Sequence, residues 1–163
     1  MKNSLASLLV LGIIASTSCG EVPRCTYAGE FKVEANAGCL VINQNRLLIV
    51  EDYLGQMSLP GGTKSSGEAP QCTAEREVWE ETGIRVSAGR KIRTLEKGFQ
   101  VYDCEIFGEQ LLDGSMRPAF SEIKNIHWLE LNQFDQADWR FPGQVSLMKQ
   151  HLRNHSAKTK NSL

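Results

Sequence analysis

Runs of aliphatic residues separated by turn-forming residues predict several short strands in this chain. Ala37–Ile42 (AGCLVI) and Arg46–Val50 (RLLIV) flank a polar turn at 43–45, a pattern typical of a buried hairpin. In the segment from 99 to 107, apolar residues occur in both alternating sets, so the pattern does not identify the buried face. Further strands are predicted at 84–86, 91–96, 99–107 and 122–129, with a turn at 87–90.

One segment in the middle of the chain has helical spacing. Ala74 and Val78 lie four residues apart and form an apolar stripe on a helix predicted from Glu68 to Thr82. The Glu68 carboxylate suits the positive end of the helix dipole. Gly83 is expected to end the helix, because glycine readily adopts the left-handed conformation found after a last helical turn.

The C-terminal part of the chain contains a second predicted helix, at 143–153, followed by a polar tail at 154–163 that we expect to be disordered. With 163 residues, 41% of them hydrophobic, the chain has enough material for one ordinary globular domain, which we place at 25–153. Strands with one helix in the middle and one at the end predict an α/β fold, an α/β/α sandwich around a mixed sheet.

The first 20 residues follow a different pattern. After Lys2, an apolar run at 5–15 (LASLLVLGIIA) leads into small residues and then Cys19. This arrangement predicts an export signal at 1–18, and the apolar run is too short for a membrane span. Two processing routes remain open: lipidation of Cys19 after lipoprotein-type cleavage, or ordinary cleavage nearby. The expected location is periplasmic, or extracytoplasmic with a lipid anchor, and membrane contact is expected only through a lipidated Cys19.

The remaining cysteines agree with export. They are even in number, and an oxidising compartment would allow two disulfides with three possible connectivities. These candidates are Cys25, Cys39, Cys72 and Cys104. No C-x2-C pair is present, so metal binding by cysteine is not expected. The formal net charge of −1 offers no bulk attraction to nucleic acid, which we therefore do not expect as a partner.

The predicted central helix carries an unusual charge arrangement. Glu77, Glu80 and Glu81 are spaced i, i+3 and i+4, so their carboxylates lie together on one helical face. Three like charges at this spacing repel one another and do not help the helix to form. A hard divalent cation resolves the repulsion, and Mg²⁺ or Mn²⁺ prefers oxygen ligands.

The spacing around these residues resembles a known signature. The fixed positions are Gly62, Glu68, Arg76-Glu77-Val78, Glu80-Glu81 and Gly83-Ile84, which read G-x5-E-x7-R-E-(apolar)-x-E-E-x-G-(apolar). This pattern is similar at every defined position to the Nudix box of the Nudix (MutT-like) hydrolases, and the flanking strands fit that family over residues 33–152. The resemblance implies a Nudix-type α/β/α sandwich. It also implies hydrolysis of a nucleoside diphosphate linked to another moiety, a small-molecule substrate.

The resemblance also implies roles for individual residues. Glu80 and Glu81 would hold Mg²⁺ (or Mn²⁺), Glu77 would be a further ligand or the base, and the Gly61 carbonyl would be an additional ligand. The expected structural supports of the box are Gly62, Glu68, Arg76 and Gly83.

A further carboxylate from outside the box is expected in this family. Glu122 is the candidate, with Asp103 and Glu105 as alternatives. The competing interpretation is a non-catalytic Nudix-fold module that binds nucleotides. Such modules usually lack a box glutamate, and this chain has all of them.

Overall fold

β1 (Ala37–Asn43) is the central strand of the sheet in the computed structural model, which describes residues 22–108, 110 and 122–161. It pairs in parallel with β6 (Gln100–Ile106) and antiparallel with β2 (Arg46–Asp52). The principal strand order is β3-β2-β1-β6-β5, with β4 paired to β1 and β7 paired to β2. Parallel and antiparallel pairs therefore occur together, and the sheet is mixed, as predicted.

The other elements follow in chain order. β3 (Met57–Ser58) and β4 (Gly61–Gly62) are short, and α1 (Pro70–Thr82) comes next. After α1 come β5 (Val86–Thr94), the 3₁₀ turn η1 (Glu96–Gly98), β6, β7 (Ile123–Leu129), the 3₁₀ segments η2 (Leu131–Gln136) and η3 (Pro142–Gln144), and α2 (Val145–Asn161). In the described part of the chain, no helix is both long and apolar enough to cross a membrane.

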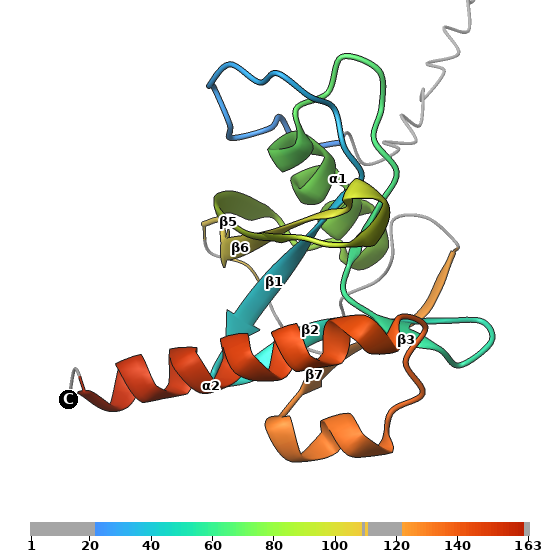
Figure 1. Cartoon of the computed structure of the whole chain (residues 1–163), viewed down its shortest axis with the longest axis vertical. Coiled ribbons are helices and arrows are strands. Elements are labelled where there is room, and N and C mark those ends of the chain that lie inside the picture. Colours follow the sequence, from blue (N-terminus) through green and yellow to red (C-terminus); the bar gives the residue numbers. More distant parts are fainter. Residues whose placement is uncertain (1–21, 109, 111–121, 162–163) are drawn as a thin grey trace, which may run out of the picture.

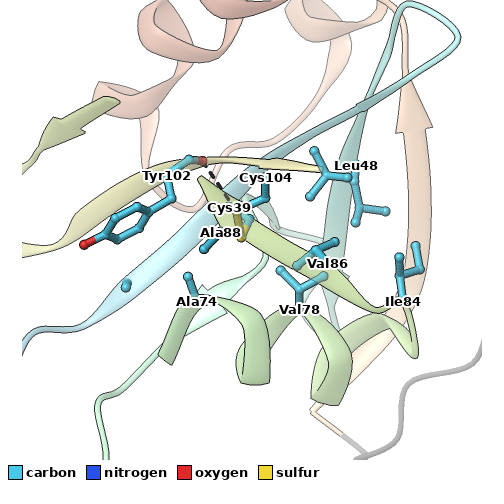
Figure 2. Close-up of a cluster of buried hydrophobic side chains, with 11 residues drawn as sticks. Cys39, Leu48, Ala74, Val78, Ile84, Val86, Ala88, Tyr102 and Cys104 are labelled. Carbon is cyan, nitrogen blue, oxygen red and sulfur yellow. Dashed lines mark hydrogen bonds between the residues drawn. A yellow bond between two sulfur atoms is a disulfide. The ribbon is translucent and has the colours of Figure 1, made fainter. Parts of the chain in front are cut away.

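The two helices cover different faces of the sheet and each encloses a core. Ala74 and Val78 of α1, both fully buried, pack against strand residues such as Leu48. Figure 2 shows these two side chains pointing from α1 toward the strands. On the other face, Met148 and Leu152 of α2 belong to a second cluster. We call the two clusters the α1-side core and the α2-side core. Figure 1 shows α1 (green) and α2 (red) apart, with strands running between them, which confirms the predicted α/β/α class.

The burial of β6 on both faces explains why apolar and polar residues do not alternate along this strand. Val101 packs in the α2-side core, whereas Tyr102 and Cys104 pack in the α1-side core. Both faces of this strand are covered, so apolar residues are required at odd and even positions alike.

The four cysteines form two disulfides, which correspond to one of the three connectivities that the sequence allowed. Cys39 and Cys104 join the neighbouring strands β1 and β6 inside the α1-side core (Figure 2), and Cys25 and Cys72 join the N-terminal segment to α1. The predicted export signal at 1–18 and the lipidation candidate Cys19 lie outside the described residues.

Three expected boundaries were wrong. α1 begins at Pro70 and not at Glu68, because Ala69 has the extended conformation (φ −64°, ψ 143°) that a following proline favours. The turn expected at 87–90 is part of one continuous strand, β5, whose pairing with β6 shifts register after Ala88 and again after Lys91. Such irregularities insert extra residues without ending a strand.

The disordered tail expected from Asn154 is the third correction. α2 continues through this segment to Asn161. Leu152 remains fully buried, and Ser156 donates a hydrogen bond to the Leu152 carbonyl (3.0 Å), so helical contacts extend past the last buried position. The polar composition of the segment therefore indicates an exposed helical end.

Candidate active site

A pocket of about 610 Å³ lies where the acidic face of α1 meets β4 and the segment after η2. Its lining includes the carboxylates Asp52, Glu77, Glu80, Glu81 and Glu122. We call this the acidic pocket. The remaining described lining residues are Asn36, Ser58, Leu59, Gly61, Gly62, Thr63, Phe99, Ile123, Arg140, Phe141 and Gln144.

The structure thus brings together the predicted residues Gly61, Glu77, Glu80, Glu81 and Glu122. The two alternatives to Glu122 lie elsewhere. Asp103 contacts His151 of α2 (3.0 Å), and Glu105 is exposed on β6. Neither residue lines the acidic pocket.

Arg76 connects the loop before α1 to the helix. Its Nε and Nη2 donate to the two oxygens of Glu68 (3.0 and 3.1 Å), and Nη2 also donates to the Thr63 carbonyl (2.8 Å). Its Nη1 donates to Glu77 (2.8 Å) and Glu80 (2.9 Å). The hydrogen bonds to Glu68 and the surrounding carboxylates hold the pKa of Arg76 above its ordinary value. This one guanidinium therefore fixes the loop and two acidic side chains together.

Glu68 is held in the loop although it is not part of the helix. Burial raises the pKa of Glu68, but hydrogen bonds from Arg76, the Ser65 N–H and the Thr73 hydroxyl outweigh it, and the pKa lies below its ordinary value. The carboxylate therefore remains charged as a partner for Arg76.

The glycines of β4 allow two close approaches. A Cβ on Gly62 would overlap the Glu77 carboxylate. A Cβ on Gly61 would lie 2.5 Å from Gly38 Cα and 2.6 Å from the Ala37 carbonyl oxygen, both on β1. Glycine is therefore needed at Gly61, where a side chain would push β4 away from the β1 backbone, whereas a side chain at Gly62 would displace the Glu77 carboxylate.

Glu81 is the most perturbed acid of the acidic pocket. One of its oxygens accepts a hydrogen bond from the Gly61 N–H (2.8 Å). Burial, together with the negative charges of Glu77 and Glu122, raises the pKa of Glu81 to about 8, although the Gly61 hydrogen bond and the positive charge of Arg140 act in the opposite direction. Burial also raises the pKa of Glu77. Ionised carboxylates in such a place require a nearby positive charge.

The chemistry of these donors fits a divalent cation. Carboxylate oxygens and a main-chain carbonyl are the ligands that Mg²⁺ and Mn²⁺ prefer. Within the described residues, however, no three Asp, Glu, His or Cys side chains already converge in a metal-binding geometry. Arg76 engages one oxygen of Glu77 and one of Glu80, so binding would require these side chains to adjust toward the pocket.

Several pocket residues were not identified from the sequence. Asp52 lies at the end of β2, where its Oδ1 accepts hydrogen bonds from the N–H groups of Leu54 (2.8 Å) and Gln56 (3.0 Å) and so shapes the rim. Arg140 and Phe141 lie between η2 and η3, far from the box in sequence. No local motif marks these positions; only the return of the chain to the sheet brings them to the pocket.

Comparisons with known proteins agree with this arrangement. The family model for the NUDIX domain matches residues 32–150. A MutT-like protein of Streptomyces ambofaciens is 47% identical over 51 residues, a match that covers 31% of this chain and only 33% of that relative.

Solved structures show the same fold at low identity. An ADP-ribose pyrophosphatase from Streptococcus suis has a TM-score of 0.61 at 21% identity, covering 74% of this chain and 92% of that one. A UDP-X diphosphatase has a TM-score of 0.58 at 15% identity, covering 79% and 66% respectively. A MutT protein from Methanosarcina mazei has a TM-score of 0.55 at 20% identity, covering 76% and 94%. Because the family model matches most of the chain, this protein belongs to the Nudix hydrolase family.

Proposed function

We propose that this protein is a metal-dependent pyrophosphohydrolase that cleaves a phosphoanhydride bond in a nucleoside diphosphate linked to another group. The observation that carries this proposal is the acidic pocket, in which the four glutamates Glu77, Glu80, Glu81 and Glu122 gather beside Gly61. The activities named for two structural neighbours, an ADP-ribose pyrophosphatase and a UDP-X diphosphatase, support this substrate class.

The chain's own residues supply binding and orientation. Glu80 and Glu81 would hold Mg²⁺ or Mn²⁺, with Glu77 and the Gly61 carbonyl as further ligands. A bound divalent cation neutralises charge on the pyrophosphate and lowers the pKa of a coordinated water. Glu122 would accept a proton from the attacking water, or Glu77 would do so if it is not a ligand.

The remaining box residues would keep this arrangement in place. Arg76 and Glu68 hold the loop against α1, and Gly62 leaves room for the Glu77 carboxylate. Gly83 ends α1 in the left-handed conformation (φ 73°), donating its N–H to the Trp79 carbonyl. Catalysis depends on such fixed geometry, because small misplacements of the reacting groups reduce rates strongly.

A substrate panel with the purified, oxidised chain tests the proposal. The panel contains nucleoside triphosphates, ADP-ribose, nucleotide sugars and dinucleoside polyphosphates, each assayed with Mg²⁺ or Mn²⁺ for phosphate-ester products. Turnover of one class that disappears in Glu80→Gln would support the proposal and name the substrate. No turnover of any class, with the cation still bound, would contradict it and favour a nucleotide-binding module.

We also propose that the protein acts outside the cytoplasm. The disulfides Cys25–Cys72 and Cys39–Cys104 support this location, because disulfides persist mainly in oxidising compartments. Cell fractionation with mass analysis of the mature N-terminus tests it. A protein found in the cytosol with residues 1–18 still attached would contradict it.

A further inference from the structure

The acidic pocket has a marked imbalance of charge. Its described lining contains five carboxylates but a single cationic side chain, Arg140. A diphosphate substrate would add further negative charge, and cations held by α1 would neutralise only the part of the substrate near that helix. Arg140 is therefore the cationic side chain of this lining that could contact the rest of the substrate.

The backbone around Arg140 is fixed to the sheet. The Met57 N–H donates to the Asp138 carbonyl (2.7 Å), and the Arg140 N–H donates to the Met57 carbonyl (2.9 Å). Trp139 lies between these two bonds and forms a parallel bridge with Met57. Because β3 leads directly into Gly61, the position of Arg140 is coupled to the strand that borders the carboxylates.

A buried aromatic contact holds the same segment from the other side. The Trp139 indole N–H donates to the Phe134 carbonyl (2.8 Å), and the two ring centroids are 5.3 Å apart. Phe134 is only 1% exposed and belongs to the α2-side core. Arg140 thus extends from an anchored stretch of chain, although it lies in neither a helix nor a long strand.

The guanidinium itself remains available. It lies 5.3 Å from the centroid of the Phe141 ring, which is 48% exposed and also lines the acidic pocket. No described carboxylate forms an ion pair with Arg140, even though five of them line the same pocket. A planar guanidinium with free N–H groups is suited to bidentate contact with a phosphate.

We propose that Arg140, from the segment between η2 and η3, binds a phosphate of the substrate's diphosphate, and that Phe141 positions the guanidinium through its ring. This rests on the proposed function, because it names how the same pocket recognises its substrate.

The test compares paired substitutions at each position. Arg140→Gln should raise KM for the substrate about 10–100-fold with a smaller change in kcat, the range expected for hydrogen bonds to a charged group. Arg140→Lys should recover part of the loss, because it restores the charge but not the bidentate geometry.

Phe141→Leu should raise KM about 2–5-fold, and Phe141→Tyr should resemble the wild type, because it retains the ring. Arg93→Gln, on the exposed part of β5, is the matched control and should change nothing.

A binding measurement separates this inference from the proposed function. Calorimetry with α,β-methylene-ADP in the presence of Ca²⁺ reports phosphate binding without turnover. Weaker binding by Arg140→Gln than by wild type and by Arg93→Gln would support the inference, whether or not any substrate is hydrolysed. Equal binding by wild type and Arg140→Gln would overturn it, as would an unchanged KM in a chain that is active. Absent hydrolysis by the wild type, by contrast, counts against the proposed function.

Discussion

Glu75 and Glu81 are carboxylates on the same helix, six residues apart, but their surroundings are opposite in character. Glu75 is 7% exposed and faces the N-terminal segment and β5. It accepts hydrogen bonds from the Thr26 N–H (2.7 Å), the Thr26 hydroxyl (2.5 Å) and the Ala88 N–H (2.9 Å). Glu81 faces the acidic pocket, where Gly61 donates to it and further carboxylates surround it.

The difference separates a structural acid from one that we propose as a metal ligand. The donors around Glu75 come from the chain itself, so its burial costs little and it connects three elements. Around Glu81, the chain provides one backbone donor, the Gly61 N–H, and the positive charge of Arg140. Burial and the negative charges of Glu77 and Glu122 outweigh both and raise the pKa of Glu81. Burial alone therefore does not distinguish a structural acid on this helix from the acids that we propose as metal ligands, whereas a complete set of hydrogen bonds from the chain does.

The largest effect is expected from Glu81→Gln. Loss of this carboxylate should reduce kcat/KM on the order of 10³-fold, in the range seen when a group that acts in proton transfer or charge stabilisation is removed. The metal-free variant should be at least as stable as the wild type, because glutamine does not have to take up a proton or bury a charge when the chain folds. Steady-state kinetics and thermal unfolding measure the two quantities. An active variant, or one that is strongly destabilised, would place Glu81 with Glu75 as a structural acid.

The Cys25–Cys72 disulfide holds Thr26 next to Glu75, to which Thr26 donates two hydrogen bonds. Removing this disulfide should have the next largest effect. The bond closes a separation of 47 residues and attaches the N-terminal segment to α1. Replacing both cysteines with serine should lower the free energy of unfolding by about 2–4 kcal/mol, as is typical for native disulfides. Denaturant unfolding measures the loss. The oxidised wild type is the reference, and an unchanged midpoint would show that Thr26 stays in place without the bond.

Glu75→Ala should reduce stability without affecting the chemistry. It leaves the buried Ala88 N–H and the Thr26 N–H without their acceptor, which should cost about 1–3 kcal/mol. The kcat of the folded fraction should be unchanged, because Glu75 does not line the acidic pocket. Unfolding curves and kinetics below the transition midpoint measure both. A loss of kcat comparable to that of Glu81→Gln would remove the distinction between the two acids.

The pH dependence of stability tests Glu81 without a substrate. The pKa of Glu81 is about 8 in the folded protein against an ordinary value of 4.5, so between these values the folded state holds a proton that the unfolded state has released. The contribution of Glu81 to stability is fully present below its ordinary pKa of 4.5 and is lost as the pH rises through its folded-state pKa of about 8. Without metal, the wild type should lose about 4 kcal/mol of stability from pH 5 to 9 relative to Glu81→Gln, or on the order of 10 °C in Tm at about 2–4 °C per kcal/mol.

Adding Mg²⁺ tests whether ionisation of Glu81 causes the pH dependence of stability. A bound cation favours the ionised carboxylate, so the difference between the wild type and Glu81→Gln should shrink or reverse at high pH. A pH dependence that is the same in both proteins would assign the effect to another group.

Much of the central helix could be predicted from residues close together in sequence. The stripe of Ala74 and Val78, the left-handed Gly83 and the shared face of Glu77, Glu80 and Glu81 depend on helical periodicity and on local backbone preferences. The start of the helix is also local, since Pro70 excludes Ala69 from helical geometry, although a carboxylate near the first turn suggested an earlier residue.

Tertiary structure alone decided how distant residues were paired. Thr26 and Glu75 are 49 residues apart, and no pattern in either segment marks the contact. The choice of disulfide partners, the anchoring of Arg140 through Met57 and the continuity of β5 likewise depend on which strands become neighbours. The physical reason is that periodicity and capping act over one or two helical turns. By contrast, the solvation and pairing of a side chain depend on everything packed around it, wherever those groups lie in the sequence.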